Sequence, residues 1–240
     1  MKYQLIRSAR RKTIALQVKN AEVIVRAPVF VKTAYIENLI QTKSLWIKEK
    51  ITQQIKTTAD SLGSSKNYFD GETSIRIDGM AHKVIVCFGK QKVTHNIVEK
   101  IIYVYLPLKY QHEPLCSKVI TSKVKLLIEK WFNGAITDYL NNKLPMLSAI
   151  TSLHPKAFKV RKYKSRWGSC NNRGELSFNS LLKMLPPWVV DYVIVHELCH
   201  LKYLNHSTNF WQLVAQHYPN YLLAKKWLKE NQTYLAWDSQ

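Results

Sequence analysis

The chain has 240 residues, with 36 lysines and arginines against 16 acidic residues, so its formal net charge is +20. A hydrophobic fraction of 46% excludes an intrinsically disordered chain, and the 7 glycines and 8 prolines exclude a collagenous or low-complexity one. The positive charge either serves solubility alone or predicts an anionic partner: nucleic acid, a nucleotide, an acidic peptide or a membrane surface.

The N-terminal residues contain no apolar run of the length found in signal peptides, and no stretch reaches the roughly 18 apolar residues of a membrane span. The four cysteines, at positions 87, 116, 170 and 199, form no C-x-x-C pair, so neither a zinc ribbon nor a redox dithiol is indicated. We therefore expect a cytoplasmic protein without a membrane partner.

The first half of the chain is predicted to consist of strands with one helix. Thr33 is expected to cap that helix, whose apolar face continues to Ile51. Asp78-Gly79 indicates a tight hairpin turn. These features predict a β-rich, mostly antiparallel N-terminal domain over residues 1–110. The expected strands are 14–18, 23–25, 74–77, 83–88 and 101–106.

The second half is predicted to be mainly helical. Apolar residues at helical spacing predict a helix from Val119 to Pro145, and Pro187 is well placed as the first residue of a helix that includes His200. A short β section is expected between these helices. The expected strands are 158–163 and 176–178, and further helices are expected to begin at Ser207 or Thr208 and at Asn220. The predicted fold class is α+β, with the catalytic domain over residues 111–240.

One motif carries chemistry: His196-Glu197-Leu198-Cys199-His200. Residues four apart lie on one face of a helix, so the two imidazoles can bind one metal ion. Zinc fits because it accepts imidazole nitrogen in tetrahedral geometry and activates water. Glu197 is then placed to take a proton from that water, as a general base.

A catalytic zinc site typically has a third protein ligand, for which the sequence offers three residues. His206 follows His200 by six residues, and Asn205 tolerates the left-handed turn that would bring a third imidazole back. Glu230 fits a scheme with a carboxylate from a later helix, and His217 fits packing or the surface better. His206 is the preferred ligand.

These residues belong to a set of motifs that resembles the YgjP-like metal-dependent hydrolases, relatives of the SprT and WLM zinc metalloproteases. The resemblance implies a zincin-like C-terminal domain that binds one Zn²⁺ ion through His196, His200 and His206, with Glu197 as general base. It does not imply a substrate. The motifs that carry it are Arg7–Thr13, Arg26-Ala27-Pro28, Trp46-Ile47, Lys164–Cys170, Leu176–Asn179, Asp191–Leu201, Asn205-His206-Ser207 and Phe210-Trp211.

A basic segment directly precedes the motif: seven cations and no acid fall between Lys156 and Arg173. Charge on both faces of a strand indicates an exposed edge, which either aligns a peptide by main-chain bonds, holds nucleotide phosphates or is merely solvated. Arg166, Lys164 and Arg161 are the candidate substrate-binding residues. Trp167 is interpreted as a packing residue and Gly168 as a turn or a position of close approach.

The leading hypothesis is a zinc-dependent metallopeptidase that uses a zinc-activated water with Glu197 as general base. One alternative keeps the metal and changes the substrate to a nucleoside triphosphate, although the chain has no phosphate-binding G-x-x-x-x-G-K-[ST] loop. A second alternative is a nucleic-acid-associated protein with a protease-like zinc domain. The partner is accordingly a peptide or protein substrate, an anionic nucleotide, or nucleic acid bound through the basic surface.

Overall fold

The computed structural model describes residues 3–19, 22–61 and 73–232. The chain divides into two compact units, Met1–Gly63 and Ser64–Gln240. The boundary expected between residues 110 and 111 falls inside the second unit. There, strands that precede residue 110 share one buried cluster with the helix that follows it.

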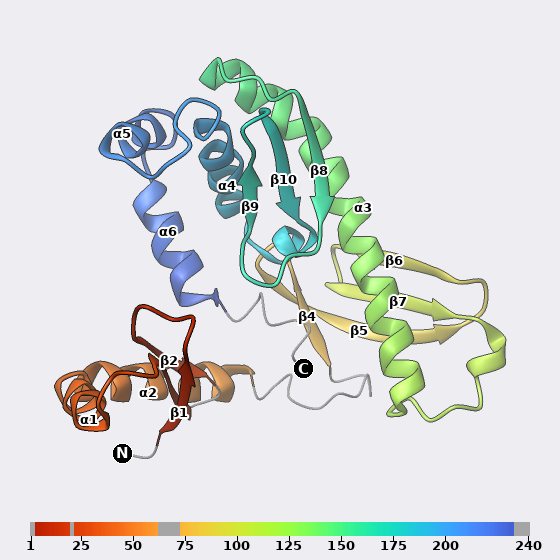
Figure 1. Ribbon diagram of the computed structural model, residues 1–240. Coiled ribbons are helices and arrows are strands. Elements are labelled where there is room, and N and C mark those ends of the chain that lie inside the picture. Colours follow the sequence, from red (N-terminus) through yellow and green to blue (C-terminus); the bar gives the residue numbers. More distant parts are fainter. Residues whose placement is uncertain (1–2, 20–21, 62–72, 233–240) are drawn as a thin grey trace. The chain divides into compact units, whose positions relative to one another are not determined.

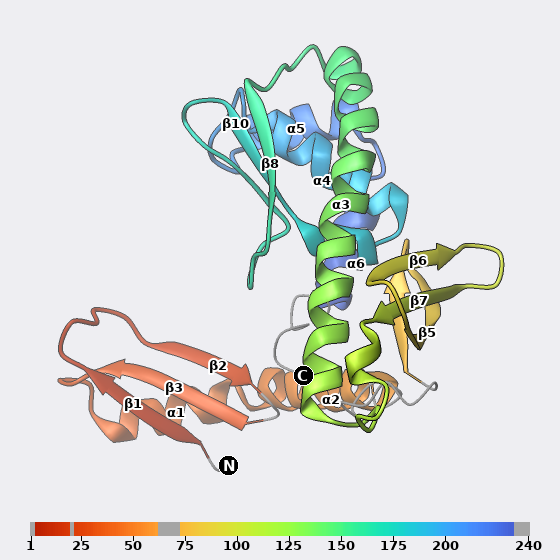
Figure 2. The ribbon, with the colours of Figure 1, turned by 90° about the vertical axis from the view of Figure 1, so that its right-hand side faces the viewer.

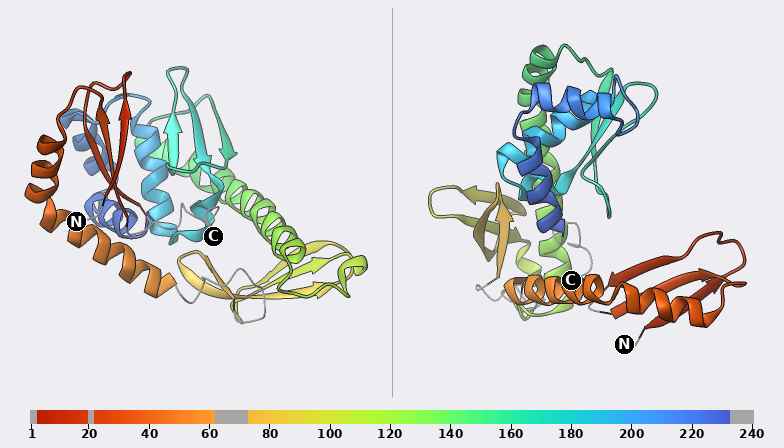
Figure 3. Two further views of the ribbon diagram at one scale, coloured as in Figure 1. Left: turned by 60° about the horizontal axis from the view of Figure 1, so that its bottom comes forward. Right: turned by 90° about the vertical axis from the view of Figure 1, so that its left-hand side faces the viewer.

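The first unit is a three-stranded sheet with two helices (Figure 3). Strand β3 lies in the middle, parallel to β1 and antiparallel to β2, and its side chains Val25 and Ala27 are buried with Ile36 and Ile47 of the helices. The helix expected from Thr33 is interrupted, and Thr33 is its first residue, not its cap. The bounds are β1 Gln4–Ser8, β2 Ala15–Lys19, β3 Glu22–Pro28, α1 Thr33–Thr42 and α2 Ser44–Ser61.

The second unit begins with a four-stranded sheet in the order β4-β5-β7-β6 (Figure 1). The hairpin predicted at Asp78-Gly79 is confirmed, and both residues adopt the positive φ, 53° and 82°, that such a turn requires. Strand β6 was not predicted, and the β5–β7 pairing is parallel, as is β1–β3. The bounds are β4 Ser74–Ile77, β5 Met80–Phe88, β6 Lys92–Asn96, β7 Ile101–Leu106 and the 3-10 helix η1 Leu108–Tyr110.

A single helix, α3 (Lys118–Thr151), packs along this sheet and continues beyond it (Figure 2). Its buried side chains follow one another at intervals of four residues, and the first of them pack on the sheet while the later ones pack on the remaining helices. The expected end at Pro145 is wrong: the helix passes through this residue, because burial of its last turn offsets the missing backbone hydrogen bond. The interval-of-four residues are Ile120, Val124, Ile128, Phe132, Ile136, Leu140, Leu144 and Ser148.

The remaining elements form a second small sheet and three helices around the later part of α3. The sheet has the order β8-β10-β9, with β10 parallel to β8 and antiparallel to β9. The expected strands 158–163 and 176–178 correspond to β8 and β10, whereas β9 between them was not expected. Helices α4 and α5 begin where they were predicted, and α6 begins one residue after the predicted Asn220. The bounds are β8 Ala157–Arg161, β9 Gly168–Cys170, β10 Glu175–Asn179, η2 Ser180–Met184, α4 Pro187–Cys199, α5 Thr208–His217 and α6 Tyr221–Glu230.

The α+β class is confirmed, because helices and small sheets are packed together in each unit. Within the described ranges, no helix combines the length and the apolar character needed to cross a bilayer.

Candidate metal centre

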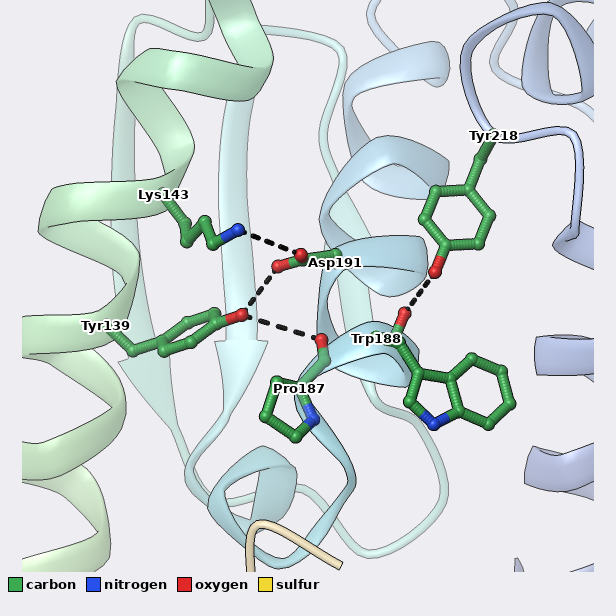
Figure 4. Close-up of polar contacts among 6 residues, drawn as sticks. All are labelled: Tyr139, Lys143, Pro187, Trp188, Asp191 and Tyr218. Carbon is green, nitrogen blue, oxygen red and sulfur yellow. Dashed lines mark hydrogen bonds and ion pairs between the residues drawn. The ribbon is translucent and has the colours of Figure 1, made fainter.

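Helix α4 carries the motif, and it is buried nearly all round because its residues are almost all apolar. Polar contacts with neighbouring elements fix its position (Figure 4). The Asp191 carboxylate accepts a 2.6 Å hydrogen bond from the Tyr139 hydroxyl and pairs with Lys143 Nζ at 3.1 Å, both from α3. The Tyr218 hydroxyl donates to the Trp188 carbonyl at 2.6 Å. These bonds fix α4 against α3 and against the segment that joins α5 to α6.

The structure brings three imidazoles together at the end of α4. One ring nitrogen from each of His196, His200 and His206 lies within 4.8 Å of the others. Nε2 of His196 and Nε2 of His206 are 3.1 Å apart. His196 lies in the last turn of the helix, His200 is the residue that ends it, and His206 comes from the loop before α5. In the described part of the chain this is the one cluster of three or more metal-binding side chains.

A hydrogen bond on the far side of the His200 ring leaves its converging nitrogen available. Nδ1 of His200 is 2.9 Å from the Tyr203 carbonyl, to which only a protonated Nδ1 can donate, so Nε2 of this ring carries its lone pair. Nδ1 of His196 faces the Tyr192 hydroxyl at 3.4 Å. Tyr203 is placed by the turns that end α4, in which the backbone N–H groups of Lys202 and Tyr203 both donate to the Cys199 carbonyl.

Aromatic side chains of α5 stack against two of the histidines. The His200 ring stacks on Phe210 with centroids 4.5 Å apart, and the His206 ring stacks on Trp211 at 5.4 Å. Trp211 stacks in turn on Tyr221 of α6, and Lys225 Nζ lies 4.0 Å from the centre of the Trp211 ring. Helices α5 and α6 thus position the third imidazole, which the short loop alone would leave free to rotate.

The electrostatics favour the neutral form of His196 and His200. Burial, together with the neighbouring His200 and His206, lowers the pKa of His196 to about 3. Burial also lowers the pKa of His200, although the hydrogen bond to the Tyr203 carbonyl opposes this effect. Neutral imidazole is the form that binds a metal ion.

Glu197 is buried beside the histidines and is tightly enclosed. Its side chain is 5% exposed, and Oε2 has no hydrogen-bond partner. Burial raises the pKa of Glu197 to about 8, against the opposing effect of Arg166. A Cβ atom on Gly168 would lie 2.6 Å from Glu197 Oε1, so only glycine leaves room for this carboxylate. Gly168 is therefore a position of close approach, as the sequence indicated.

The basic segment only partly matches its prediction. Strand β8 ends at Arg161, so Lys164 and Arg166 lie in the following loop and do not alternate on a strand. The strand that contacts α4 is β9, whereas β8 forms the opposite edge of the sheet. Asn179 fastens the loop, because its Nδ2 donates to the Tyr163 and Arg166 carbonyls, both at 2.9 Å. Of the three candidate cations, Arg166 is the one whose charge acts on Glu197.

The other proposed ligands lie elsewhere. His217 ends α5 and Glu230 ends α6, and neither belongs to the histidine cluster. The left-handed turn expected at Asn205 is wrong, because its φ is not positive. The chain leaves the helix through the turns at Lys202 and Tyr203 instead.

Comparison with known proteins shows the family of the chain. A family model described as "YgjP-like, metallopeptidase domain" matches residues 12–231. The chain belongs to the YgjP-like family. The YgjP-like chain also matches the crystal structure of the metallopeptidase zymogen of Pyrococcus abyssi abylysin, with 20% identity and a TM-score of 0.36, over 39% of this chain and 95% of that one. The comparison with curated proteins gave no match.

A metallopeptidase domain implies a metal ion, and the YgjP-like residues fit one. Two nitrogens that bind one tetrahedral zinc ion lie about 3.3 Å apart, close to the 3.1 Å between Nε2 of His196 and Nε2 of His206. The unpartnered Oε2 of Glu197 is a buried acceptor that a water molecule at such an ion would satisfy. His196, His200 and His206 are therefore the residues that would hold the ion.

Sequence reasoning missed some residues of this YgjP-like site. The Tyr203 carbonyl orients His200, and a main-chain acceptor leaves no mark on residue type. The stacking of Trp211 on His206 was also missed, although the histidine-to-tryptophan spacing was visible as part of the family resemblance. An aromatic residue one turn into the helix after a ligand is the signal that would have identified it.

Proposed function

We propose that the protein is a zinc-dependent peptidase in which His196, His200 and His206 bind the ion and Glu197 is the general base. The observation that carries the proposal is the buried Oε2 of Glu197, which lacks a partner beside three converging imidazole nitrogens. A bound zinc ion supplies a Lewis acid that polarises a carbonyl group and makes water a better nucleophile.

The chain's own residues then handle the proton. In its carboxylate form Glu197 accepts a proton at Oε2 from the attacking water and passes it to the leaving amine, as general acid–base catalysis of peptide hydrolysis requires. Gly168 keeps the carboxylate next to the histidines, since any larger residue would displace it. Arg166 supplies a positive charge near the site, for the developing oxyanion or for a carboxylate of the substrate.

The substrate strand is assigned to the free edge of β9. In the described chain β9 pairs with β10 on one side only, and it contacts α4. An extended peptide that adds to this edge through main-chain hydrogen bonds would present a carbonyl group near Glu197. This assignment replaces the earlier one to the basic strand β8, which forms the other edge.

The test combines metal analysis with a substrate screen. The purified chain is expected to hold one zinc ion and to cleave an unfolded protein or a peptide library, as read by mass spectrometry. Glu197→Gln is expected to lower the rate by at least about 100-fold, the scale of a lost general base. Glu230→Gln removes an exposed acid outside the site and serves as the matched control.

Two results would contradict the proposal. A Glu197→Gln variant with undiminished cleavage would exclude the general-base role. The second result is hydrolysis of nucleoside triphosphates without any peptide cleavage. If Glu197→Gln abolished that hydrolysis, the metal site would stand but its substrate would be a nucleotide. His206→Ala should release the metal, whereas His217→Ala should not, because His217 lies outside the cluster.

A further inference from the structure

The four-stranded sheet β4-β5-β7-β6 is covered by α3 on one face. Val84 and Val104 are fully buried in the cluster that includes α3. Because side chains alternate along a strand, the residues between them point to the opposite face. The tyrosine face, as we name it, consists of Arg76, Lys83, Ile85, Cys87, Lys92, Thr94, Tyr103 and Tyr105. Within the described ranges, neither of its tyrosines packs into a buried cluster.

The strand register places aromatic rings at the centre of this face. Tyr103 lies beside Ile85 of β5, and Tyr105 lies beside Lys92 of β6. The two tyrosines are two positions apart on β7, about 7 Å along the strand. Lys92 Nζ lies over the Tyr105 ring, 4.7 Å from its centre, so the cation covers one face of this ring and leaves the other face for a partner.

The charge on the tyrosine face is positive. Lys83 and Lys92 are exposed, on the two strands that flank β7. None of the four strands contains an acidic residue. The neighbouring acids lie in turns: Asp78 is paired with Lys183, and Glu99, which accepts a hydrogen bond from Asn96, also accepts one from the Tyr103 hydroxyl at one end of the face.

We propose that the tyrosine face binds single-stranded nucleic acid. Bases would stack on Tyr103 and Tyr105, and the phosphates on either side would contact Lys83 and Lys92. A sheet that presents aromatic rings between cations is the arrangement on which single strands stack without a sequence requirement. An acidic peptide would satisfy the lysines but would leave the two ring surfaces without a partner. The proposal is independent of the peptidase activity, because none of its residues lies at the histidine cluster.

The experiment is fluorescence anisotropy of a labelled 20-nucleotide oligothymidylate with the full chain, in EDTA and over a series of salt concentrations. Lys83→Glu with Lys92→Glu is expected to weaken binding by at least about tenfold at 0.1 M salt. It should also lower the slope of log K against log salt by about 1.4, the value for two lost phosphate contacts. Lys118→Glu with Lys123→Glu, two exposed positions on α3, makes the same change in net charge and should weaken binding less than twofold.

The aromatic contribution is tested separately. Tyr103→Ala with Tyr105→Ala should weaken binding by about tenfold or more, since stacking contributes about 1–3 kcal/mol per base. Tyr103→Phe with Tyr105→Phe keeps the rings and the packing, and should bind within twofold of the parent. Absence of binding at 50 mM salt, an equal loss in the Lys118/Lys123 variant, or a loss in the phenylalanine variant as large as in the alanine variant would overturn the proposal. Equal or tighter binding of a 20-base-pair duplex or of polyglutamate would overturn it as well.

Discussion

Gly168→Ala is expected to disable Glu197 without disturbing the metal ligands. The added Cβ would lie 2.6 Å from Oε1, 2.7 Å from Cγ and 2.9 Å from Cδ of Glu197. Since carbon atoms in contact prefer about 3.5–4.0 Å, the carboxylate must move by about 1 Å. A displacement of that size costs about 100-fold in rate. The backbone itself accepts alanine, because Gly168 does not need a positive φ.

The assay for Gly168→Ala compares zinc content, peptidase rate and thermal unfolding with those of Gly134→Ala. Zinc content should be unchanged, the rate should fall by about 100-fold, and stability should fall by about 1–2 kcal/mol through overpacking. Gly134 lies in α3 with no atom within 4 Å of an added Cβ, so its alanine variant should be active and about 0.5–1 kcal/mol more stable.

A double-mutant cycle makes the Gly168 prediction sharper. In a Glu197→Ala background the clash is gone, so Gly168→Ala should cost no stability there. Full activity of the single Gly168→Ala variant, or the same loss of stability in both backgrounds, would refute the argument that this glycine makes room for the carboxylate.

Three further predictions concern the metal and the support of α4. Chelation of a zinc ion present at 100 times its Kd should lower the free energy of unfolding by about 2.7 kcal/mol, which calorimetry would detect, and His206→Ala should abolish this difference. Asp191→Ala removes the 2.6 Å acceptor of the partly buried Tyr139 hydroxyl, which keeps only the Pro187 carbonyl at 3.5 Å, and should destabilise the chain by about 1–3 kcal/mol in denaturant unfolding. Gly79→Ala needs a positive φ and places Cβ 2.6 Å from Pro186, so a loss of more than about 1 kcal/mol is expected, and an unchanged unfolding midpoint would contradict it.

The parts of the fold that follow local rules were predictable. Pro187 begins α4 because its fixed φ suits the first turn of a helix, and Asp78-Gly79 forms the hairpin because both residues tolerate positive φ. The spacing of His196, Glu197 and His200 also indicated which side chains meet, and the structure brings His206 to them. The ligand and base roles of these residues stay predictions.

Features that depend on tertiary packing were not predictable. Strand β9 has only three residues, and Gly168 within it has no strand propensity, so it forms because it pairs with β10 and packs against α4. Helix α3 continues past Pro145 because Leu144 and Ser148 are buried, which no local rule indicates. The contact of β9 rather than β8 with α4 likewise follows from strand order, which the basic residues did not reveal.

The interval of four along α3 has a geometric consequence for the second unit. A helix repeats every 3.6 residues, so each step of four turns the buried side by about 40°. The six steps from Ile120 to Leu144 therefore rotate it by about 240°. The four-stranded sheet and α4 therefore pack on different sides of α3. The spacing of the buried residues along α3 sets the angle between them. Inserting one residue at Gly134 would turn everything beyond it by about 100° and separate partners whose individual contacts are intact.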